Sequence, residues 1–226
     1  MLRRLRQEKD MKKPVRPPSV SDEQIRGLLK RYACPVPFHE IRTRFLGNIA
    51  SPAMNASPME AVKRLWNNDL PEFESTEEAK ELIGPLVMGL WNQLARHQER
   101  SAPFRLTRLT TSATVQGVES LARTRRQELD GFVEGFFGSQ ESVDIPERAH
   151  RGMDTLGNIR ALFASLENVS EDEGGAGALK NAETTVRRLH EMTKLAEREM
   201  HAVVLSCVRA RKQMLAGLPI KKPTVH

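Results

Sequence analysis

A cysteine and a histidine near the N-terminus have side chains that can bind zinc. Cys34 and His39 are separated by four residues, and thiolate and imidazole are the usual ligands of structural zinc sites. A closed zinc site needs four ligands, and no second pair follows nearby. We therefore predict no metal at this position and interpret His39 as a hydrogen-bonded or exposed side chain.

The C-terminal part of the chain holds two fragments of metal-site patterns. His190-Glu191 begins like the zincin motif HExxH, but position 194 is a lysine. Glu197 and His201 lie one helical turn apart, a spacing that suits a metal or an ion pair on a helix surface. One such pair leaves most metal ligands unfilled, so we predict the surface ion pair.

The sequence patterns of common catalytic sites are missing from the chain. It contains no nucleophile elbow, P-loop, Rossmann glycine pattern or complete zincin spacing. We therefore predict that the protein is not an enzyme and that it has no catalytic residue, cofactor or metal site.

The two tryptophans lie in the segment from Ser57 to His97, which has the densest apolar periodicity of the N-terminal half. Trp66 and Trp91 could stack on a ligand or a nucleic-acid base. Because both stand at helical spacing among Leu and Val, we predict that they belong to the hydrophobic core.

Basic residues concentrate at the two ends of the chain, and these ends hold the candidate partner-binding residues. The formal charge is +6, and residues 1–18 alone carry a net +5. Such an arm can attach to nucleic acid, an acidic protein or an anionic membrane surface, whereas a solvated tail that binds nothing is the alternative. The candidates are Arg3, Arg4, Arg6, Lys12, Lys13 and Arg16 in the arm, and Arg209, Arg211 and Lys212 near the C-terminus.

Composition indicates a water-soluble helical protein. Of 226 residues, 39% are hydrophobic and 28% charged, and no run approaches the ~20 apolar residues of a membrane-spanning helix. The N-terminus has no apolar h-region, so we expect a cytoplasmic location. There, Cys34 and Cys207 would be reduced thiols, with a disulfide between them as the alternative.

Apolar spacing and helix-start signals predict an all-α fold in two parts. The first part, 19–100, is expected to hold helices that start at Ser21, Phe38, Ser57 and Ser75, and Gly84-Pro85 should kink or split the last of them. An extended connector follows at 101–114. The second part, 115–216, is expected to hold helices over about 115–137, from about 144, and over about 179–215. Residues 1–18 form a predicted disordered basic arm, and 217–226 form a basic tail.

The long final helix has apolar residues in a heptad-like 3-4 alternation that is broken at Thr193. This seam could pair with a second copy of the chain, giving a homodimer through the 179–215 helix. Short loops and two amphipathic neighbouring helices favour packing within one chain.

Several segments, taken in order, resemble one family. They are FHEIRTRFLGNIASP, then LW…LPEFES…EEAKELI…LVMGLWNQLA between Trp66 and Leu94, then ELDGFVEGFFG, TLGNIRAL, SEDEGG and the tail KKPTVH. The segment from Trp66 to Leu94 looks like the hallmark of the YecA/YgfB-like proteins, and the likeness extends over about Ser21 to His226. This chain departs from the family at Glu40, where a glycine is typical, and at Gly84-Pro85.

The resemblance implies a largely uncharacterised bacterial, cytoplasmic protein with an all-α, two-part fold. It further implies an interaction or regulatory role rather than catalysis, with another protein as the partner. Some family members carry a C-terminal cysteine-rich zinc module, which this chain does not have. The alternative function is a nucleic-acid- or ribosome-associated protein that binds through its basic ends.

Overall fold

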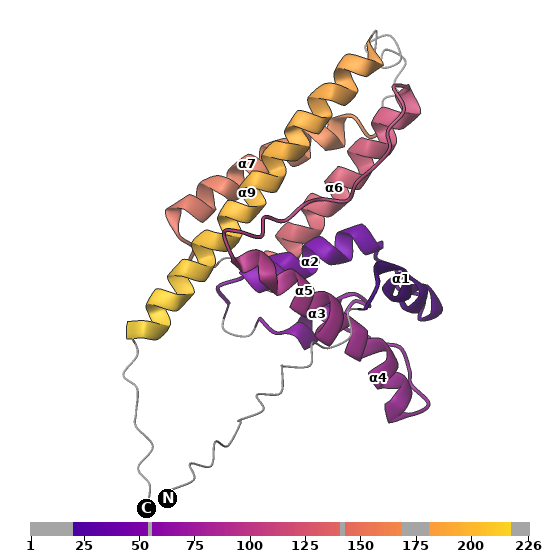
Figure 1. Ribbon diagram of the computed structural model, residues 1–226, viewed down its shortest axis with the longest axis vertical. Helices are drawn as coiled ribbons and strands as arrows, with labels where there is room; N and C mark the ends of the chain where they lie inside the picture. The colour runs from indigo at the N-terminus through magenta and orange to yellow at the C-terminus, as the bar shows by residue number, and fades with distance from the viewer. Residues whose placement is uncertain (1–19, 54–55, 141–142, 169–180, 218–226) are drawn as a thin grey trace, which may run out of the picture.

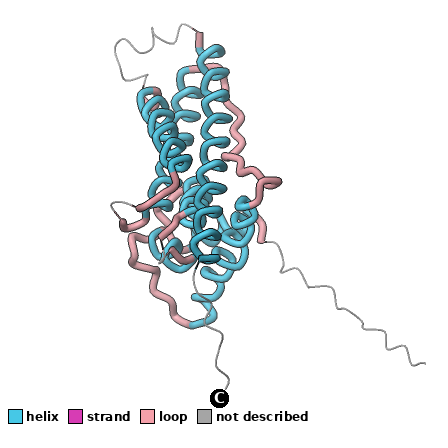
Figure 2. Tube along the Cα trace, turned by 90° about the vertical axis from the view of Figure 1, so that its left-hand side faces the viewer, coloured by secondary structure: helices cyan, strands magenta, loops and turns pink. Residues whose placement is uncertain are grey.

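The computed structural model describes residues 20–53, 56–140, 143–168 and 181–217 (Figure 1). Within these ranges all regular structure is helical and no strand occurs, which confirms the predicted all-α class (Figure 2). The predicted disordered arm, the segment SEDEGG and the tail from residue 218 lie outside the described residues. No helix in the described ranges is both long and apolar enough to cross a bilayer.

The first helices begin where local signals predict. Helix α1 (Asp22–Arg31) has a complete capping box, in which Ser21 accepts from the Gln24 backbone and Gln24 accepts from the Ser21 backbone. Helix α2 (Phe38–Ala50) follows Pro37. Helix α3 (Pro58–Arg64) is capped by Ser57 and has proline at its first position, where the missing N–H costs no hydrogen bond.

Gly84-Pro85 interrupts the next helix, as predicted. Helix α4 (Thr76–Gly84) ends there, and a π-helix, η1 (Pro85–Trp91), carries the chain into the short helix α5 (Asn92–Ala95) and the 3-10 turn η2 (Arg96–Gln98). Proline has no N–H to donate to the preceding turn, so the regular ladder breaks at this residue.

In the described residues of the second part, three helices pack against one another (Figure 1). Helix α6 (Val115–Phe137) matches the predicted range, and helix α7 (Glu147–Ser165) begins after Pro146. Helix α9 (Ala182–Gly217) packs against α7, α6 and α2. Its apolar seam is buried within the chain, which confirms the intramolecular packing. The fully or nearly fully buried seam residues are Leu189, Ala196, Met200, Val203 and Cys207.

Helices α2 and α6 make the most extensive contact between elements in the described structure. Glycines allow this approach. A Cβ atom at Gly135 would lie 2.0 Å from the Arg44 carbonyl oxygen, and one at Gly47 would lie 2.2 Å from the Phe132 carbonyl oxygen. The two backbones therefore touch directly. One cluster of buried side chains then runs through both predicted parts of the chain.

The connector between η2 and α6 is held by side chains instead of by a neighbouring strand. Glu197 on α9 accepts from the Leu106 N–H at 3.0 Å, and Glu128 on α6 accepts from the Thr107 N–H at 2.8 Å. Arg125 donates to the Thr107 carbonyl at 2.7 Å. These groups satisfy the backbone that a β-ladder would otherwise pair, so the segment stays extended without forming a strand.

Candidate functional site

The candidate cations near the C-terminus lie on the last turns of α9 and do not form one surface. Arg209 and Lys212 are exposed. Arg211 is half-buried and donates to the carbonyl of Ile49 at 3.0 Å and to that of Ser51. These carbonyls stand at the end of α2, where backbone acceptors have no helical partner. Arg211 therefore fastens α9 to α2, a role that the sequence did not indicate.

The six candidate residues of the N-terminal arm, Arg3, Arg4, Arg6, Lys12, Lys13 and Arg16, lie outside the described residues. Their binding role stays a prediction from the sequence.

Arg209 and Lys212 line a depression of about 380 Å³ that we call the basic groove. Arg100, from the segment after η2, lines it as well, and Leu205 and Val208 give it apolar surface. None of the three cations forms an ion pair with another described residue. Their charges are thus available to an acidic partner. The remaining lining residues are Gln98, Gln213 and Ala216.

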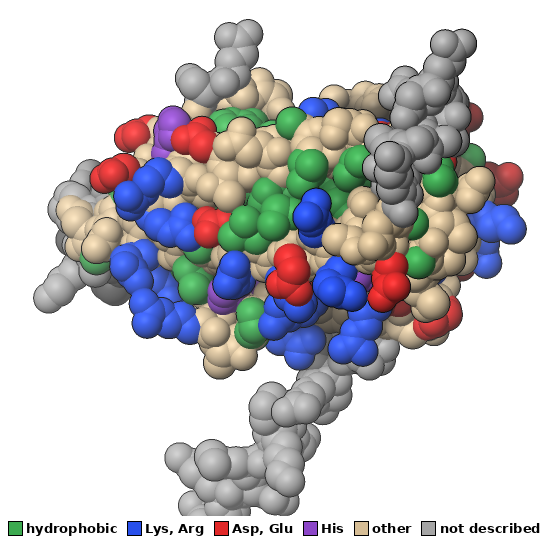
Figure 3. Space-filling view, turned by 90° about the horizontal axis from the view of Figure 1, so that it is seen from above, with side chains coloured by type: hydrophobic (Ala, Val, Ile, Leu, Met, Phe, Trp, Pro, Cys, Tyr) green, Lys and Arg blue, Asp and Glu red, His purple; other side chains and the backbone are tan. Residues whose placement is uncertain are grey.

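Two further exposed cations, Arg198 and Arg108, lie outside the lining of the basic groove. Arg198 shares a face of α9 with Leu205, Arg209 and Lys212, because these residues follow it by 7, 11 and 14 positions, which are close to whole turns of a helix. Arg108 on the connector and Arg198 are exposed and form no ion pair within the described chain. In a view down the long axis, Lys and Arg side chains gather along one edge of the molecule (Figure 3).

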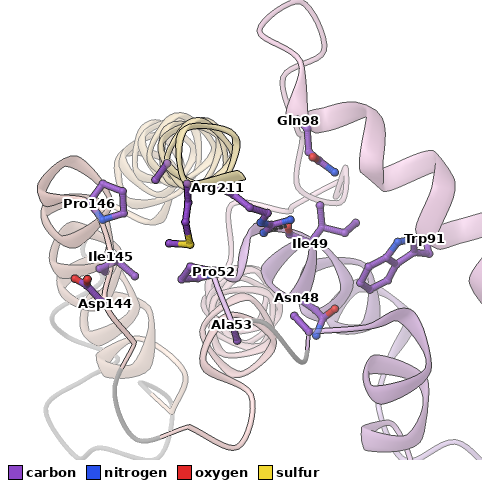
Figure 4. A pocket seen from close by; sticks show the side chains of 13 residues that line it. Asn48, Ile49, Pro52, Ala53, Trp91, Gln98, Asp144, Ile145, Pro146 and Arg211 are labelled. Atoms are coloured by element: carbon purple, nitrogen blue, oxygen red, sulfur yellow. Dashed lines mark hydrogen bonds between the residues drawn. The ribbon is translucent and has the colours of Figure 1, made fainter. Parts of the chain in front are cut away.

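A second and larger cavity, of about 540 Å³, lies on the other side of the end of α9 (Figure 4). We call it the basal groove. Gln98 lines both grooves, so the last turns of α9 stand between them. The polar lining of the basal groove consists of Asn48, Gln98, Asp144 and Arg211. Its apolar lining consists of Ile49, Pro52, Ala53, Ala56, Trp91, Ile145, Pro146, Ala210 and Met214.

One polar side chain in the basal groove has an unmet hydrogen-bonding capacity. Asn48 is only 4% exposed, and its Oδ1 atom has no hydrogen-bond partner among the described residues. Buried polar atoms in folded proteins are normally paired with protein, water or a ligand. This acceptor therefore needs a donor from water or from another molecule.

The two tryptophans differ in their surroundings. Trp66 belongs to the core, as predicted, and its indole N–H donates to the Tyr32 carbonyl at 2.9 Å. Trp91 is half-buried, meets Phe45 edge-on at 5.7 Å between ring centroids, and lines the basal groove. Helical spacing could not separate the two cases, because both residues stand among aliphatic neighbours.

The side chains that suggested metal binding have other partners. Cys34 donates to the Val36 carbonyl, and the His39 ring nitrogen Nε2 lies 2.8 Å from Gln127 Oε1. Glu191 pairs with Lys194 at 2.7 Å. Within the described ranges, no three His, Cys, Asp or Glu side chains gather as a metal site would require.

The predicted surface ion pair between Glu197 and His201 is wrong. Glu197 is buried and instead accepts from the Leu106 N–H and from Arg105, which lies at 2.7 Å. Both ring nitrogens of His201 are buried and lack a described partner in good hydrogen-bond geometry, although the Arg100 backbone lies near the ring. Burial, with His97 and Arg105 nearby, lowers the pKa of His201. The Glu197 carboxylate binds the connector because the backbone N–H of Leu106 needs a hydrogen-bond acceptor.

Both cysteines are free thiols, and Cys207 is buried while Cys34 is half-buried. Burial raises the pKa of the Cys207 thiol to about 11, and burial also raises the pKa of Cys34. A thiol reacts as its thiolate, so both groups are in their unreactive form near neutral pH.

No protein-family model, curated protein or solved structure matches this chain. The resemblance to the YecA/YgfB-like proteins therefore stays a prediction from the sequence.

Proposed function

We propose that this chain is a non-catalytic helical interaction or regulatory protein of the YecA/YgfB-like type, acting in the cytoplasm, and that it binds a partner protein at the basic groove. The observation that carries the proposal is the combination of Arg100, Arg209 and Lys212, none of which pairs with a described carboxylate, with apolar surface from Leu205 and Val208. An amphipathic acidic helix has the matching pattern of one apolar and one negative face.

The test is a pull-down from nuclease-treated lysate of the source organism with three versions of the full chain. They are the unchanged chain, a variant with Arg209→Glu and Lys212→Glu, and a control with Arg187→Glu and Arg188→Glu near the other end of α9. All four residues are exposed. Each variant replaces two basic residues with glutamates, so both change the net charge of the chain equally.

We expect one protein to be retained by the unchanged chain and the control but lost from the groove variant. Retention of the same protein by all three versions would show that the basic groove is not its binding surface.

A nucleic-acid- or ribosome-associated protein is the second candidate, and the exposed cations that pair with no described carboxylate favour it. Arg108 and Arg198 add to the three cations of the basic groove, and residues 1–18 carry a net +5. Phosphate contacts would make the affinity fall steeply with salt. A gel shift at increasing salt, with the full chain and with residues 1–18 deleted, tests this candidate. Absence of binding at low salt would remove it.

A homodimer through the 179–215 helix also stays a proposal. The seam of α9 is buried within one chain, so such a dimer would have to use the exposed face that carries Arg198, Arg209 and Lys212. Like charges on that face oppose self-association at low salt. Sedimentation equilibrium at low and high salt measures the mass directly, and we expect any dimer to strengthen with salt.

A further inference from the structure

The basal groove is separate from the basic groove and carries a chemistry of its own. Its volume of about 540 Å³ falls within the ~300–1,000 Å³ typical of pockets that enclose small ligands. It is lined by segments far apart in the chain: the end of α2, η1, η2, the segment before α7, and α9 (Figure 4). Most of its lining is apolar, and three of its four polar side chains, those of Asn48, Arg211 and Asp144, decide what it can bind.

Asn48 presents the first of these groups. Its Oδ1 accepts no hydrogen bond from the described residues, although Asn48 is only 4% exposed. Leaving a buried acceptor unpaired is unfavourable, so this atom calls for an N–H or O–H donor.

Arg211 presents the second. Its Nη2 donates to the carbonyls of Ile49 and Ser51, so the guanidinium lies at the end of α2, the helix whose last turn holds Asn48. No carboxylate pairs with it in the described structure. A guanidinium has five N–H donors, so donors remain for an anion after both carbonyls are served.

Asp144 presents the third and gives the groove a direction. It is exposed and lies beside Ile145, away from Asn48 and Trp91 (Figure 4). Its negative charge disfavours an anion at that end, so the favourable place for an anion is beside Arg211.

We propose that the basal groove binds the C-terminal end of a peptide whose last side chain is bulky and apolar. The terminal carboxylate lies against Arg211, the last backbone N–H donates to Asn48 Oδ1, and the side chain packs on the wall that includes Trp91 and Met214. The peptide's carboxylate thus accepts from Arg211, its N–H donates to Asn48, and its apolar side chain covers the apolar wall of the groove.

Titration of the full chain with two acetylated pentapeptides, both ending in leucine, tests the proposal by isothermal calorimetry and tryptophan fluorescence. One has a free carboxylate, and the other is amidated. We expect the free acid to bind about tenfold more tightly or better, because the charged contact to Arg211 is lost on amidation. Binding should also shift the emission, since Trp91 lines the groove.

A matched pair of variants locates the binding. Met214 and Met88 are 61% and 62% exposed, and only Met214 lines the groove. Met214→Glu should reduce binding at least tenfold by repelling the carboxylate, and Met88→Glu should leave it unchanged. Asn48→Ala should also weaken binding, with circular dichroism to confirm its fold.

Three results would overturn the proposal: equal binding of the acid and the amide, equal effects of the two methionine variants, or no binding at millimolar peptide. The last would mean that water alone satisfies Asn48. The Arg209→Glu/Lys212→Glu variant should retain peptide binding, so failure at the basic groove and failure here can be told apart.

Discussion

Arg125 and Glu128 form an ion pair inside α6 that fixes the connector. The side chains are 4% and 0% exposed, and together they bind the backbone of Thr107 and, through Arg125 Nε at 3.2 Å, the hydroxyl of Thr193. Thr193 is the residue that breaks the heptad seam of α9. The break is therefore the point where α9 supplies a polar partner to α6.

Removing one member of this buried pair should be costly. Glu128→Ala leaves Arg125 buried without its anion and the Thr107 N–H without its acceptor, so we expect a loss of about 3–5 kcal/mol in the free energy of unfolding. Urea denaturation measures it. The control is Glu191→Ala, which removes an exposed pair with Lys194 and should change the midpoint little. Equal effects would contradict a structural role for the buried pair.

His201 should make stability depend on pH. Burial lowers the pKa of His201 in the folded chain, and burial likewise lowers that of His97. The unfolded chain then takes up protons first, so stability is complete above the ordinary histidine pKa of about 6.5 and falls as the pH drops below it.

Urea midpoints between pH 7.5 and 5.5 should therefore decrease toward acid. His201→Leu removes one of the two titrating groups and should flatten this decrease. An unchanged pH dependence in the variant would exclude His201 as a contributor.

At the scale of elements, the contact between α2 and α6 depends on small residues. Gly135→Ala places a Cβ atom 2.0 Å from the backbone of Arg44, so the helices must separate, and we expect a destabilisation of about 1–3 kcal/mol or more. Gly157→Ala is the control, since no atom lies within 4 Å of its Cβ. That change should stabilise α7 by about 0.5–1 kcal/mol, because alanine favours helix. Thermal unfolding of both variants should give opposite signs.

Helix ends show how far local signals reach. Ser21 with Gln24, Ser57 with Pro58, and Gly84 with Pro85 each mark a boundary that the structure confirms. Cap and proline effects act within one turn, so a short stretch of sequence contains all that decides them. Arg211, in contrast, acts on the carbonyl of Ile49, which is 162 positions away, so the residues around Arg211 in the sequence do not indicate this role.

At the scale of the whole molecule, the α2–α6 contact and the shared core should make the described chain unfold as one unit. Both tryptophans lie in the first part, so fluorescence reports on that part. Most of the described helical residues lie in the second part, so far-UV circular dichroism reports mainly on that one. Fluorescence and far-UV circular dichroism should therefore give coincident urea transitions. A fluorescence transition at lower urea would show instead that the first part unfolds separately.

The sequence by itself determined the helical class and most helix starts, because apolar periodicity and capping are local patterns, and it favoured packing of the α9 seam within one chain. Only the tertiary structure decided which polar groups meet. Glu197 serves the connector and not His201, and Asn48, Gln98, Asp144 and Arg211 line one groove although up to 163 positions separate them. Their meeting follows from how whole helices pack, and a side chain's own neighbours in the chain do not specify that.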